Sequence, residues 1–237
     1  MLLIIPDLHE ELDIYNKIMT RYNHITKKLS LGDWYDSFNY ESSAHAEETA
    51  MAHADFVRDP NNICLWGNHD LQYAFPQCHG VFCSGWGGWK QLGITKHMGP
   101  LWDKIQLAHW ETLNGHEWLM SHAGFHPFMY HPIRGFDRAR VAELCAEAMT
   151  SVKFANTITP TLSVGRRRGG NHRYGGCTWM DFRDFEPIPG INQIVGHTKG
   201  RMVREYRIDD SKNYCIDTGA QHVALLDDDG TVTIEEI

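Results

Sequence analysis

The sequence predicts an α/β protein in which parallel strands alternate with helices. Up to residue 66, short apolar segments alternate with longer amphipathic ones in a β-α-β-α-β order, and this order implies parallel strands joined by right-handed crossovers. From residue 191 onward, apolar and polar positions alternate as in a series of strands. With 237 residues the chain is long enough for one substantial core, so we expect a single domain over 1–237.

The first part of the chain justifies this order element by element. Strands are expected at 2–5 and 63–66, where the residues are apolar, and at 25–31, which ends in Leu29-Ser30-Leu31. A helix is expected at 11–22, because one face carries Leu12, Tyr15, Ile18 and Met19. A second helix, rich in Ala and Glu, is expected at 41–58 and ends near Pro60.

Residues 71–112 are less regular and rich in glycine. We expect an inserted loop followed by a helix at about 100–112, and we assign the inserted lid or substrate segments to about 79–110 and 156–190. The stretch 84–102 carries Trp86, Trp89 and Trp102. It has two interpretations, a lid that stacks a nucleobase or core packing under the loop, and packing is favoured.

The remaining elements follow with fewer ambiguities. A strand is expected at 117–121, and a helix at 137–151, where apolar residues recur with helical spacing. The C-terminal strands are expected at 191–195, 202–207, 213–217, 221–226 and 231–235. A hairpin turn at Asp228-Asp229-Gly230 joins the last two.

Composition and charge argue against several classes of protein. The net charge of −8 disfavours a nucleic-acid-binding surface. No stretch approaches the roughly 18 apolar residues of a membrane span, and the first residues lack the pattern of a signal peptide. We therefore expect a cytoplasmic protein without a membrane partner. The six cysteines form no C-x-x-C pair, which favours free thiols over disulfides or zinc ligands.

Polar side chains that can bind a metal follow five of the expected strands. They are Asp7 and His9, Asp33, Asn68, His122 and His197. Side chains just past the carboxyl ends of neighbouring strands converge on one crevice in an open α/β sheet. Six ligands are too many for one small cation, so they suit two metals that share a bridging carboxylate.

The order of these motifs resembles that of the calcineurin-like metallophosphoesterases. The motifs are Asp7-x-His9, Gly32-Asp33-x-x-Asp36, Gly67-Asn68-His69-Asp70, Ser121-His122-Ala123-Gly124 and Gly196-His197-Thr198. The resemblance implies a four-layer α/β/β/α sandwich with mixed sheets. It also implies two divalent metal ions, with Mn²⁺ as the expected metal and Fe, Zn or Co as substitutes.

The resemblance also assigns a role to each motif residue. Asp7 and His9 would hold the first metal, Asp33 would bridge both, and Asn68, His122 and His197 would hold the second. His69 would be the general acid that protonates the leaving oxygen, and Asp36 would hydrogen-bond its imidazole.

Two sequence features bear on the branch of this family. Lys199 stands where the nuclease-like and cyclic-nucleotide branches carry a second histidine ligand. This feature and Cys215-Ile216-Asp217-Thr218-Gly219 resemble the serine/threonine-protein-phosphatase branch, in particular its compact phage-type members and the diadenosine tetraphosphate hydrolases. In that branch an Arg-Gly pair follows Asp36, whereas Ser37-Phe38 stands here, so the expected phosphate-binding arginine is missing.

The loop Arg166-Arg167-Arg168-Gly169-Gly170 offers a replacement. Guanidinium groups match phosphate oxygens in a bidentate way, and glycine permits close backbone approach. Arg168 and Arg173 are our candidates for substrate binding, and Arg183 is a further one. The alternative is a solvated basic surface loop.

These features together predict a dinuclear-metal phosphoesterase. It would hydrolyse phosphate monoesters, with phosphoproteins as a possible substrate class, through attack of a metal-bridging hydroxide and without a covalent intermediate. Hydrolysis of a dinucleoside polyphosphate is the alternative function, and a non-catalytic metal-binding scaffold or a nuclease is less favoured. The expected partner is a phosphorylated small molecule, a nucleotide or a phosphoprotein. Nucleic acid is disfavoured, and the oligomeric state is left open.

Overall fold

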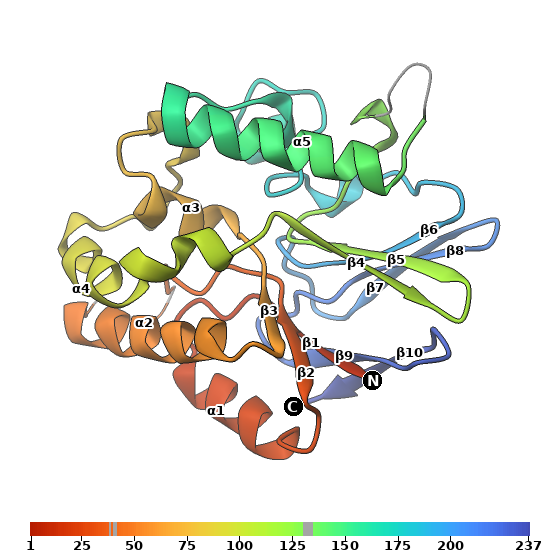
Figure 1. The fold of residues 1–237 in the computed structure, drawn as a ribbon, viewed down its shortest axis with the longest axis horizontal. Helices are drawn as coiled ribbons and strands as arrows, with labels where there is room; N and C mark the ends of the chain where they lie inside the picture. Colours follow the sequence, from red (N-terminus) through yellow and green to blue (C-terminus); the bar gives the residue numbers. More distant parts are fainter. Residues whose placement is uncertain (38, 40–41, 130–134) are drawn as a thin grey trace.

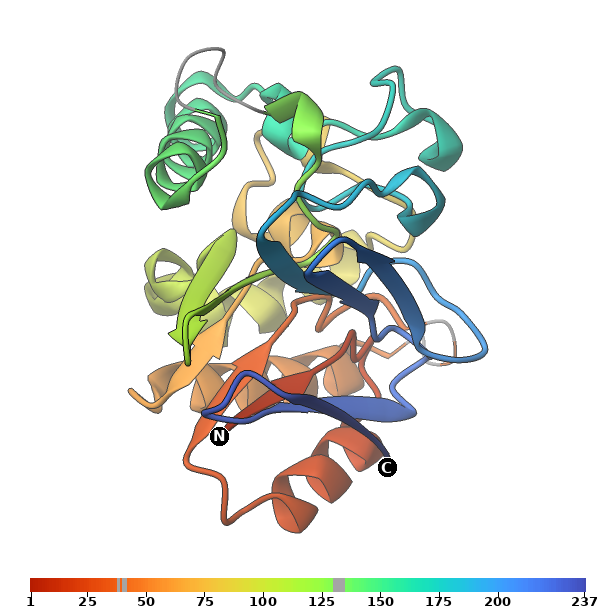
Figure 2. The ribbon, with the colours of Figure 1, turned by 90° about the vertical axis from the view of Figure 1, so that its right-hand side faces the viewer.

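Two five-stranded sheets pack face to face in the computed structural model, which describes residues 1–37, 39, 42–129 and 135–237 (Figures 1 and 2). In the first sheet the strand order is β10-β9-β1-β2-β3. Its parallel strands are β1 (Leu2–Ile5), β2 (Lys27–Ser30) and β3 (Asn62–Cys64). The antiparallel strands β9 (His222–Leu226) and β10 (Val232–Glu236) extend the sheet past β1.

The second sheet has the order β4-β5-β6-β8-β7. Its central strands β5 (His116–Ser121), β6 (Ile191–Val195) and β8 (Ser211–Cys215) are parallel to one another. The outer strands β4 (Ala108–Leu113) and β7 (Arg204–Ile208) are antiparallel to their neighbours. Both sheets are therefore mixed, as the resemblance implied.

Alternate side chains along a strand belong to two different buried clusters, one between the two sheets and one between a sheet and its helices. Leu2 and Ile4 of β1 belong to a buried cluster that also takes Trp118 and Met120 from β5 of the other sheet. The intervening β1 residues, Leu3 and Ile5, belong to the buried cluster that contains the helix side chains. Successive side chains of a strand point to opposite faces, so each sheet has one face on the other sheet and one on helices.

Helices cover the outer faces and complete four layers. The helices α1 (Leu12–Arg21) and α2 (Ser43–Arg58) lie on the first sheet, and α4 (Gly88–Met98) packs against α2 (Figure 1). On the other side, α5 (Arg138–Thr150) lies over the second sheet, and a π-helical turn (Ser151–Ala155) follows it. The predicted α/β/β/α sandwich is confirmed. The expected helix start at Glu41 and the position of Phe38 lie outside the described residues.

The prediction of a helix at about 100–112 is wrong. A helix lies at Gly88–Met98, a 3-10 helix follows at Gly99–Lys104, and Ala108–Leu113 is strand β4. Strand β4 pairs with β5 through a two-residue turn, in which Asn114 and Gly115 both have positive φ (47° and 79°). An Asn-Gly pair between two alternating segments is a strong hairpin signal, and the helix prediction did not take it into account.

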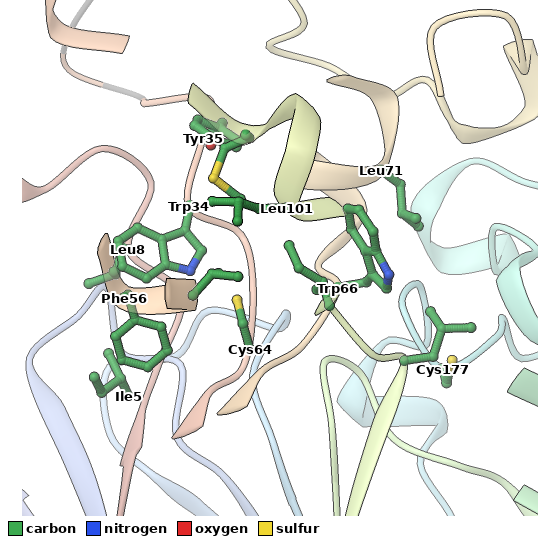
Figure 3. Close-up of a cluster of buried hydrophobic side chains, with 14 of the residues drawn as sticks. Ile5, Leu8, Trp34, Tyr35, Phe56, Cys64, Trp66, Leu71, Leu101 and Cys177 are labelled. Carbon is green, nitrogen blue, oxygen red and sulfur yellow. The ribbon is translucent and has the colours of Figure 1, made fainter. Parts of the chain in front are cut away.

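The tryptophans of 84–102 do not share one role. Trp102 stacks on Trp66, with ring centroids 5.4 Å apart, and so belongs to the core (Figure 3 shows Trp66 there). Trp86 and Trp89 remain 40% and 48% exposed on the surface. In the other expected insertion, residues 156–190, the chain forms short 3-10 turns at Pro160–Leu162, Arg166–Arg168 and Phe182–Asp184. Among the described residues, no helix is long and apolar enough to cross a membrane.

Candidate metal centre

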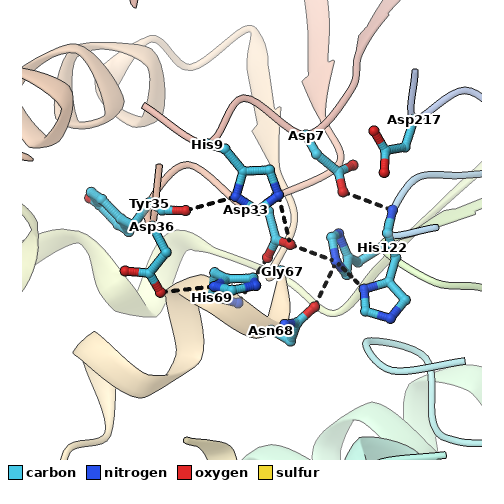
Figure 4. Close-up of polar contacts among 12 residues, drawn as sticks. Asp7, His9, Asp33, Tyr35, Asp36, Gly67, Asn68, His69, His122 and Asp217 are labelled. Carbon is cyan, nitrogen blue, oxygen red and sulfur yellow. Dashed lines mark hydrogen bonds and ion pairs between the residues drawn. The ribbon is translucent and has the colours of Figure 1, made fainter. Parts of the chain in front are cut away.

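The six expected ligands come together where the parallel strands of both sheets end (Figure 4). They follow β1, β2 and β3 of the first sheet and β5 and β6 of the second. Both sheets present their carboxyl ends to the same end of the sandwich, which is why residues from 7 to 197 meet. After β3 the chain turns at Gly67 into the short helix α3 (Asn68–Ala74), so Asn68 and His69 are the first two residues of that helix.

His122 lies at the middle of this group. Its Nδ1 lies 2.9 Å from the carbonyl oxygen of Leu31, to which it donates, so Nε2 of a neutral ring presents a lone pair to the site. That Nε2 lies 3.0 Å from Oδ1 of Asn68, 3.2 Å from Oδ2 of Asp33 and 3.2 Å from Nδ1 of His197. Three potential ligand atoms therefore lie 3.0–3.2 Å from Nε2 of His122, close enough for all four atoms to bind one cation.

The electrostatics of the group also favour a cation. Burial alone lowers the pKa of His122, but the charges of Asp33 and Asp7 outweigh it and raise that pKa to about 9. Burial opposes ionisation of Asp33 as well, yet the nearby His122 and His69 rings lower the pKa of this carboxyl far below its usual range. The field that holds a proton at His122 attracts a divalent cation for the same reason.

His9 and Asp7 complete the other side of Asp33. Nδ1 of His9 donates to the carbonyl oxygen of Tyr35 at 3.0 Å, and its Nε2 points toward Oδ2 of Asp33 at 3.7 Å. Oδ2 of Asp7 accepts the backbone N–H of His197 at 2.8 Å. Oδ1 of Asp7 and Nε2 of His197 are buried and have no hydrogen-bond partner among the described residues. Buried polar atoms without partners are costly unless a ligand binds them.

This donor set fits two divalent cations. Asp33 lies within ligand reach of His9 on one side and of His122 and His197 on the other. The six ligands supply imidazole nitrogen, carboxylate oxygen and amide oxygen, and no thiolate. Such nitrogen and oxygen donors suit Mn²⁺, Fe or Zn.

Two glycines bring the acidic ligands close to neighbouring motifs. A Cβ at Gly196 would lie 2.0 Å from Oδ1 of Asp7, and one at Gly67 would lie 2.1 Å from Oδ1 of Asp33. Any side chain at these positions would displace a carboxylate. Glycine is therefore required before His197 and before Asn68, because Gly196 leaves space for the Asp7 carboxylate and Gly67 leaves space for the Asp33 carboxylate.

His69 and Asp36 form the hydrogen-bonded pair that the resemblance implied. Nδ1 of His69 lies 2.8 Å from Oδ2 of Asp36, and the backbone N–H of His69 donates to Oδ1 of Asp33 at 2.8 Å. Burial lowers the pKa of His69, but Asp33 and the hydrogen bond to Asp36 together raise it well above the usual value. The imidazole lines the pocket over the metal centre, so it can present a proton there.

A buried network that sequence reasoning missed surrounds Asp36. Lys90 of α4 is 3% exposed, and its Nζ lies 2.8 Å from Oε1 of Glu10 and 3.2 Å from Oδ1 of Asp36. Tyr73 and Gln72 of α3 also donate to the Asp36 carboxylate. No sequence signal marks this network, since Lys90 lies 80 and 54 residues from its two carboxylates.

Asp70 has a structural function. Its carboxylate accepts the backbone N–H groups of Asp33, Trp34 and Gly67 at 2.8, 2.9 and 3.0 Å. It therefore fixes the loop that carries Asp33 to the turn that carries Asn68 and His69.

A pocket of about 420 Å³ opens over the centre. Arg168, Trp179 and Lys199 line it together with ligands of the centre. Asp217 also lines the pocket. Burial raises the pKa of the Asp7 carboxyl most, and the nearby charge of Asp217 raises it further. Sequence reasoning noted the 215–219 motif but did not assign Asp217 to the site; its place directly after β8 was the available signal.

The candidate arginines occupy different positions. Arg168 donates to Oγ1 of Thr198 at 3.0 Å and lines the pocket. The guanidinium of Arg173 lies over the Tyr174 ring, 4.9 Å from its centroid, and Arg183 makes two 2.8 Å hydrogen bonds to Asp181. Neither Arg173 nor Arg183 is among the residues that line this pocket.

Comparison with solved structures identifies the fold. The chain is similar to a cold-active protein-tyrosine phosphatase from a psychrophilic Shewanella species, with a TM-score of 0.60 and 13% identity over 98% of this chain and 79% of that one. It is similar to a hypothetical protein from Pyrococcus horikoshii, with a TM-score of 0.56 and 12% identity over 100% and 88%. A serine/threonine phosphatase from Saccharomyces cerevisiae gives a TM-score of 0.51 and 12% identity over 99% and 78%.

No protein-family model matches the sequence, and no curated protein matches it either. At these identities the likeness concerns the fold. Together with the two mixed sheets and their outer helices, it shows that the chain has the four-layer α/β/β/α fold of these two phosphatases.

Proposed function

We propose that this protein is a metal-dependent phosphoesterase that hydrolyses phosphate monoesters, with phosphoproteins as a candidate substrate class. One observation carries the proposal. The same 420 Å³ pocket is lined by His69, which has Asp36 behind it, by Arg168 and by five of the six expected ligands, Asp7, His9, Asp33, Asn68 and His197. These are the three parts that phosphoryl transfer to water needs: a metal centre, an acid and a cation for the phosphate oxygens.

The centre would hold two divalent cations, and we propose Mn²⁺. Asp7, His9 and Asp33 would hold one, and Asn68, His122 and His197 would hold the other with Asp33 shared. When bound, such a pair polarises a phosphoryl oxygen and lowers the pKa of a water molecule.

The protein side chains supply the remaining steps. Asp36 holds the Nδ1 proton of His69, which leaves the Nε2 proton for the leaving oxygen of the ester. Arg168 is placed to bind a non-reacting phosphoryl oxygen, and Asp181 fixes its guanidinium, with Oδ2 3.2 Å from Nε. Loss of the leaving alcohol and return of a proton to His69 from solvent complete a turnover.

Hydrolysis of a dinucleoside polyphosphate is the second candidate, and Trp179 is the observation that favours it. Its indole lines the pocket beside His197, with ring centroids 5.7 Å apart, where it offers a surface for a base. Of the stretch 84–102, in contrast, Ser84 lines the pocket and none of its tryptophans does. The proposed base-stacking lid therefore finds no support there.

The test is a substrate panel with added Mn²⁺. It contains p-nitrophenyl phosphate, a phosphoserine peptide, diadenosine tetraphosphate and a cyclic nucleotide, each also assayed after removal of metal with a chelator. We expect metal-dependent turnover of the monoesters to exceed that of the cyclic nucleotide. Faster turnover of the dinucleotide would establish the second candidate instead. No turnover on any member, with metal bound, would overturn the assignment as an esterase.

A further inference from the structure

Cys83 lies against the proposed acid, and the function proposed above does not use it. Its Sγ is 3.4 Å from Nδ1 of His69, which in turn lies 2.8 Å from Oδ2 of Asp36. One ligand atom from each of these three residues lies within 4.8 Å of the other two. The thiol belongs to the segment after α3, and the backbone N–H of Cys83 donates to Oε1 of Gln72 at 3.0 Å, which fixes its position.

The three atoms have the chemistry of a zinc site. Thiolate sulfur, imidazole nitrogen and carboxylate oxygen are the common zinc ligands, at about 2.3, 2.0 and 2.1 Å from the metal. In a tetrahedron these lengths place ligand atoms roughly 3.3 to 3.6 Å apart. The S···N distance of 3.4 Å already meets this requirement, and the N···O distance of 2.8 Å needs to lengthen by about 0.5 Å.

Access and charge are also compatible with a metal. His69 and Ser84, the neighbour of Cys83, line the pocket, so a cation can approach from there, and Cys83 itself is half-buried. A divalent cation would replace the thiol proton of Cys83 and the Nδ1 proton of the His69 imidazolium, both released to solvent. The net charge of the buried cluster with Lys90 and Glu10 then stays the same.

We propose that Asp36, His69 and Cys83 form a third metal site, which binds a thiophilic divalent cation such as Zn²⁺ and inhibits the enzyme. A cation on Nδ1 of His69 replaces the hydrogen bond between His69 and Asp36. The proton donor is then a neutral imidazole, which is a weaker acid than the imidazolium, and the enzyme is inhibited for this reason. The site itself is independent of the proposed function, whereas the inhibition rests on it.

The first experiment detects the sulfur ligand directly. Because the six ligands of the main centre are nitrogen and oxygen donors, a thiolate-to-cobalt charge-transfer band in the near ultraviolet reports the third site alone. We titrate the full chain with Co²⁺ and expect d–d bands from the main centre, followed by the charge-transfer band. Cys83→Ser removes that band, and Cys145→Ser, which changes a half-buried cysteine on α5, keeps it.

Two outcomes would overturn the site. One is Co²⁺ binding to the wild type without a charge-transfer band. The other is an unchanged band in Cys83→Ser. Asp36→Asn provides a second variant, in which we expect Co²⁺ to bind through sulfur more than about tenfold more weakly, because a ligand is lost. Thermal unfolding of each variant, compared with wild type, establishes that it is folded.

The second experiment tests inhibition in the Mn²⁺-loaded enzyme. Each variant is compared with its own activity without zinc. We expect the Zn²⁺ concentration for half-inhibition to rise more than about tenfold in Cys83→Ser and to stay the same in Cys145→Ser. An equal zinc sensitivity in all three proteins would refute the inhibitory role. A Cys83-dependent cobalt band in a protein without esterase activity would leave the site valid and refute the proposed function.

Discussion

Lys90 forms a buried ion pair with Asp36, in which Nζ lies 3.2 Å from Oδ1. Lys90 comes from α4, in the segment 79–110 that the sequence marks as an insertion, whereas Asp36 follows β2 and holds the proposed acid. The same ammonium group also pairs with Glu10 at 2.8 Å. The insertion therefore contributes a positive charge that, together with His69, stands against the two buried carboxylates of Glu10 and Asp36.

Lys90→Met is expected to lower the free energy of unfolding by about 3–5 kcal/mol, because it leaves the buried Glu10 carboxylate without its counter-ion and leaves Asp36 with His69 alone. The matched control is Lys96→Met on the same helix. Lys96 pairs with Glu47 at the surface, and its loss is expected to lower the free energy of unfolding much less, because an exposed ion pair contributes little. Urea unfolding of both variants measures the difference, and equal losses would contradict the role of the buried pair.

His69→Ala is expected to lower turnover by on the order of 10²–10⁴ while metal content stays near that of the wild type. The loss should be larger for an alkyl phosphate than for p-nitrophenyl phosphate, because nitrophenolate leaves without a proton. The exposed His24 supplies the control variant His24→Ala. Steady-state kinetics and metal analysis test this, and full activity on both esters would exclude His69 as the acid.

Asp33 and Asp36 allow a paired test of the metal assignment. Asp33→Ala removes the carboxylate shared by His9 and His122, so we expect the loss of metal and activity together. Asp36→Asn keeps the ligands of the main centre and is expected to lower activity without loss of the two metals. Metal content after dialysis measures both, and two retained metals in Asp33→Ala would refute the bridging role.

Gly196→Ala tests the close contact between two motifs. Its Cβ would lie 2.0 Å from Oδ1 of Asp7, so the carboxylate must move out of the first metal position. We expect the metal affinity to fall by more than about tenfold, as for loss of a supporting contact. At Gly99, which has φ −45°, the nearest atom to an added Cβ is 3.7 Å away, so Gly99→Ala is the control. Unchanged metal binding in Gly196→Ala would contradict this geometry.

The ligand positions could be predicted from sequence because a local rule fixes them. Asp7, Asp33, Asn68, His122 and His197 each stand directly after an apolar segment, and parallel strands bring such positions to one end of a sheet. The strand β4 was missed although a local signal was present, the Asn114-Gly115 pair. The helix at 88–98 was missed because it begins at Gly88 and contains Gly93, against intrinsic helix preference.

Contacts between distant segments carry no local signal. Lys90 reaches Glu10 and Asp36, and Cys83 reaches His69, only after α4 has packed on α2 and the loop before it has closed over α3. Nothing in the spacing of Lys90 or Cys83 sets them apart from a surface lysine or a buried thiol. For the same reason the sequence did not separate Arg168, which lines the pocket, from Arg173, which lies over Tyr174.

That difference between the two arginines is the basis of the last prediction. Arg168 is held toward the pocket by Thr198 and Asp181, at 3.0 and 3.2 Å, so its remaining guanidinium donors can bind a phosphoryl oxygen. Arg168→Met is expected to raise KM for a phosphomonoester roughly 10- to 100-fold, the equivalent of one charge-assisted hydrogen bond of about 1.5–3 kcal/mol. Arg173→Met should leave KM within about twofold, since such a surface change removes little binding energy. Steady-state kinetics with both variants, after metal analysis has shown full loading, decides between the two arginines. If Arg173→Met raised KM as much as Arg168→Met, Arg168 would not bind the phosphate specifically. The basic loop would then act only as a solvated, positively charged surface.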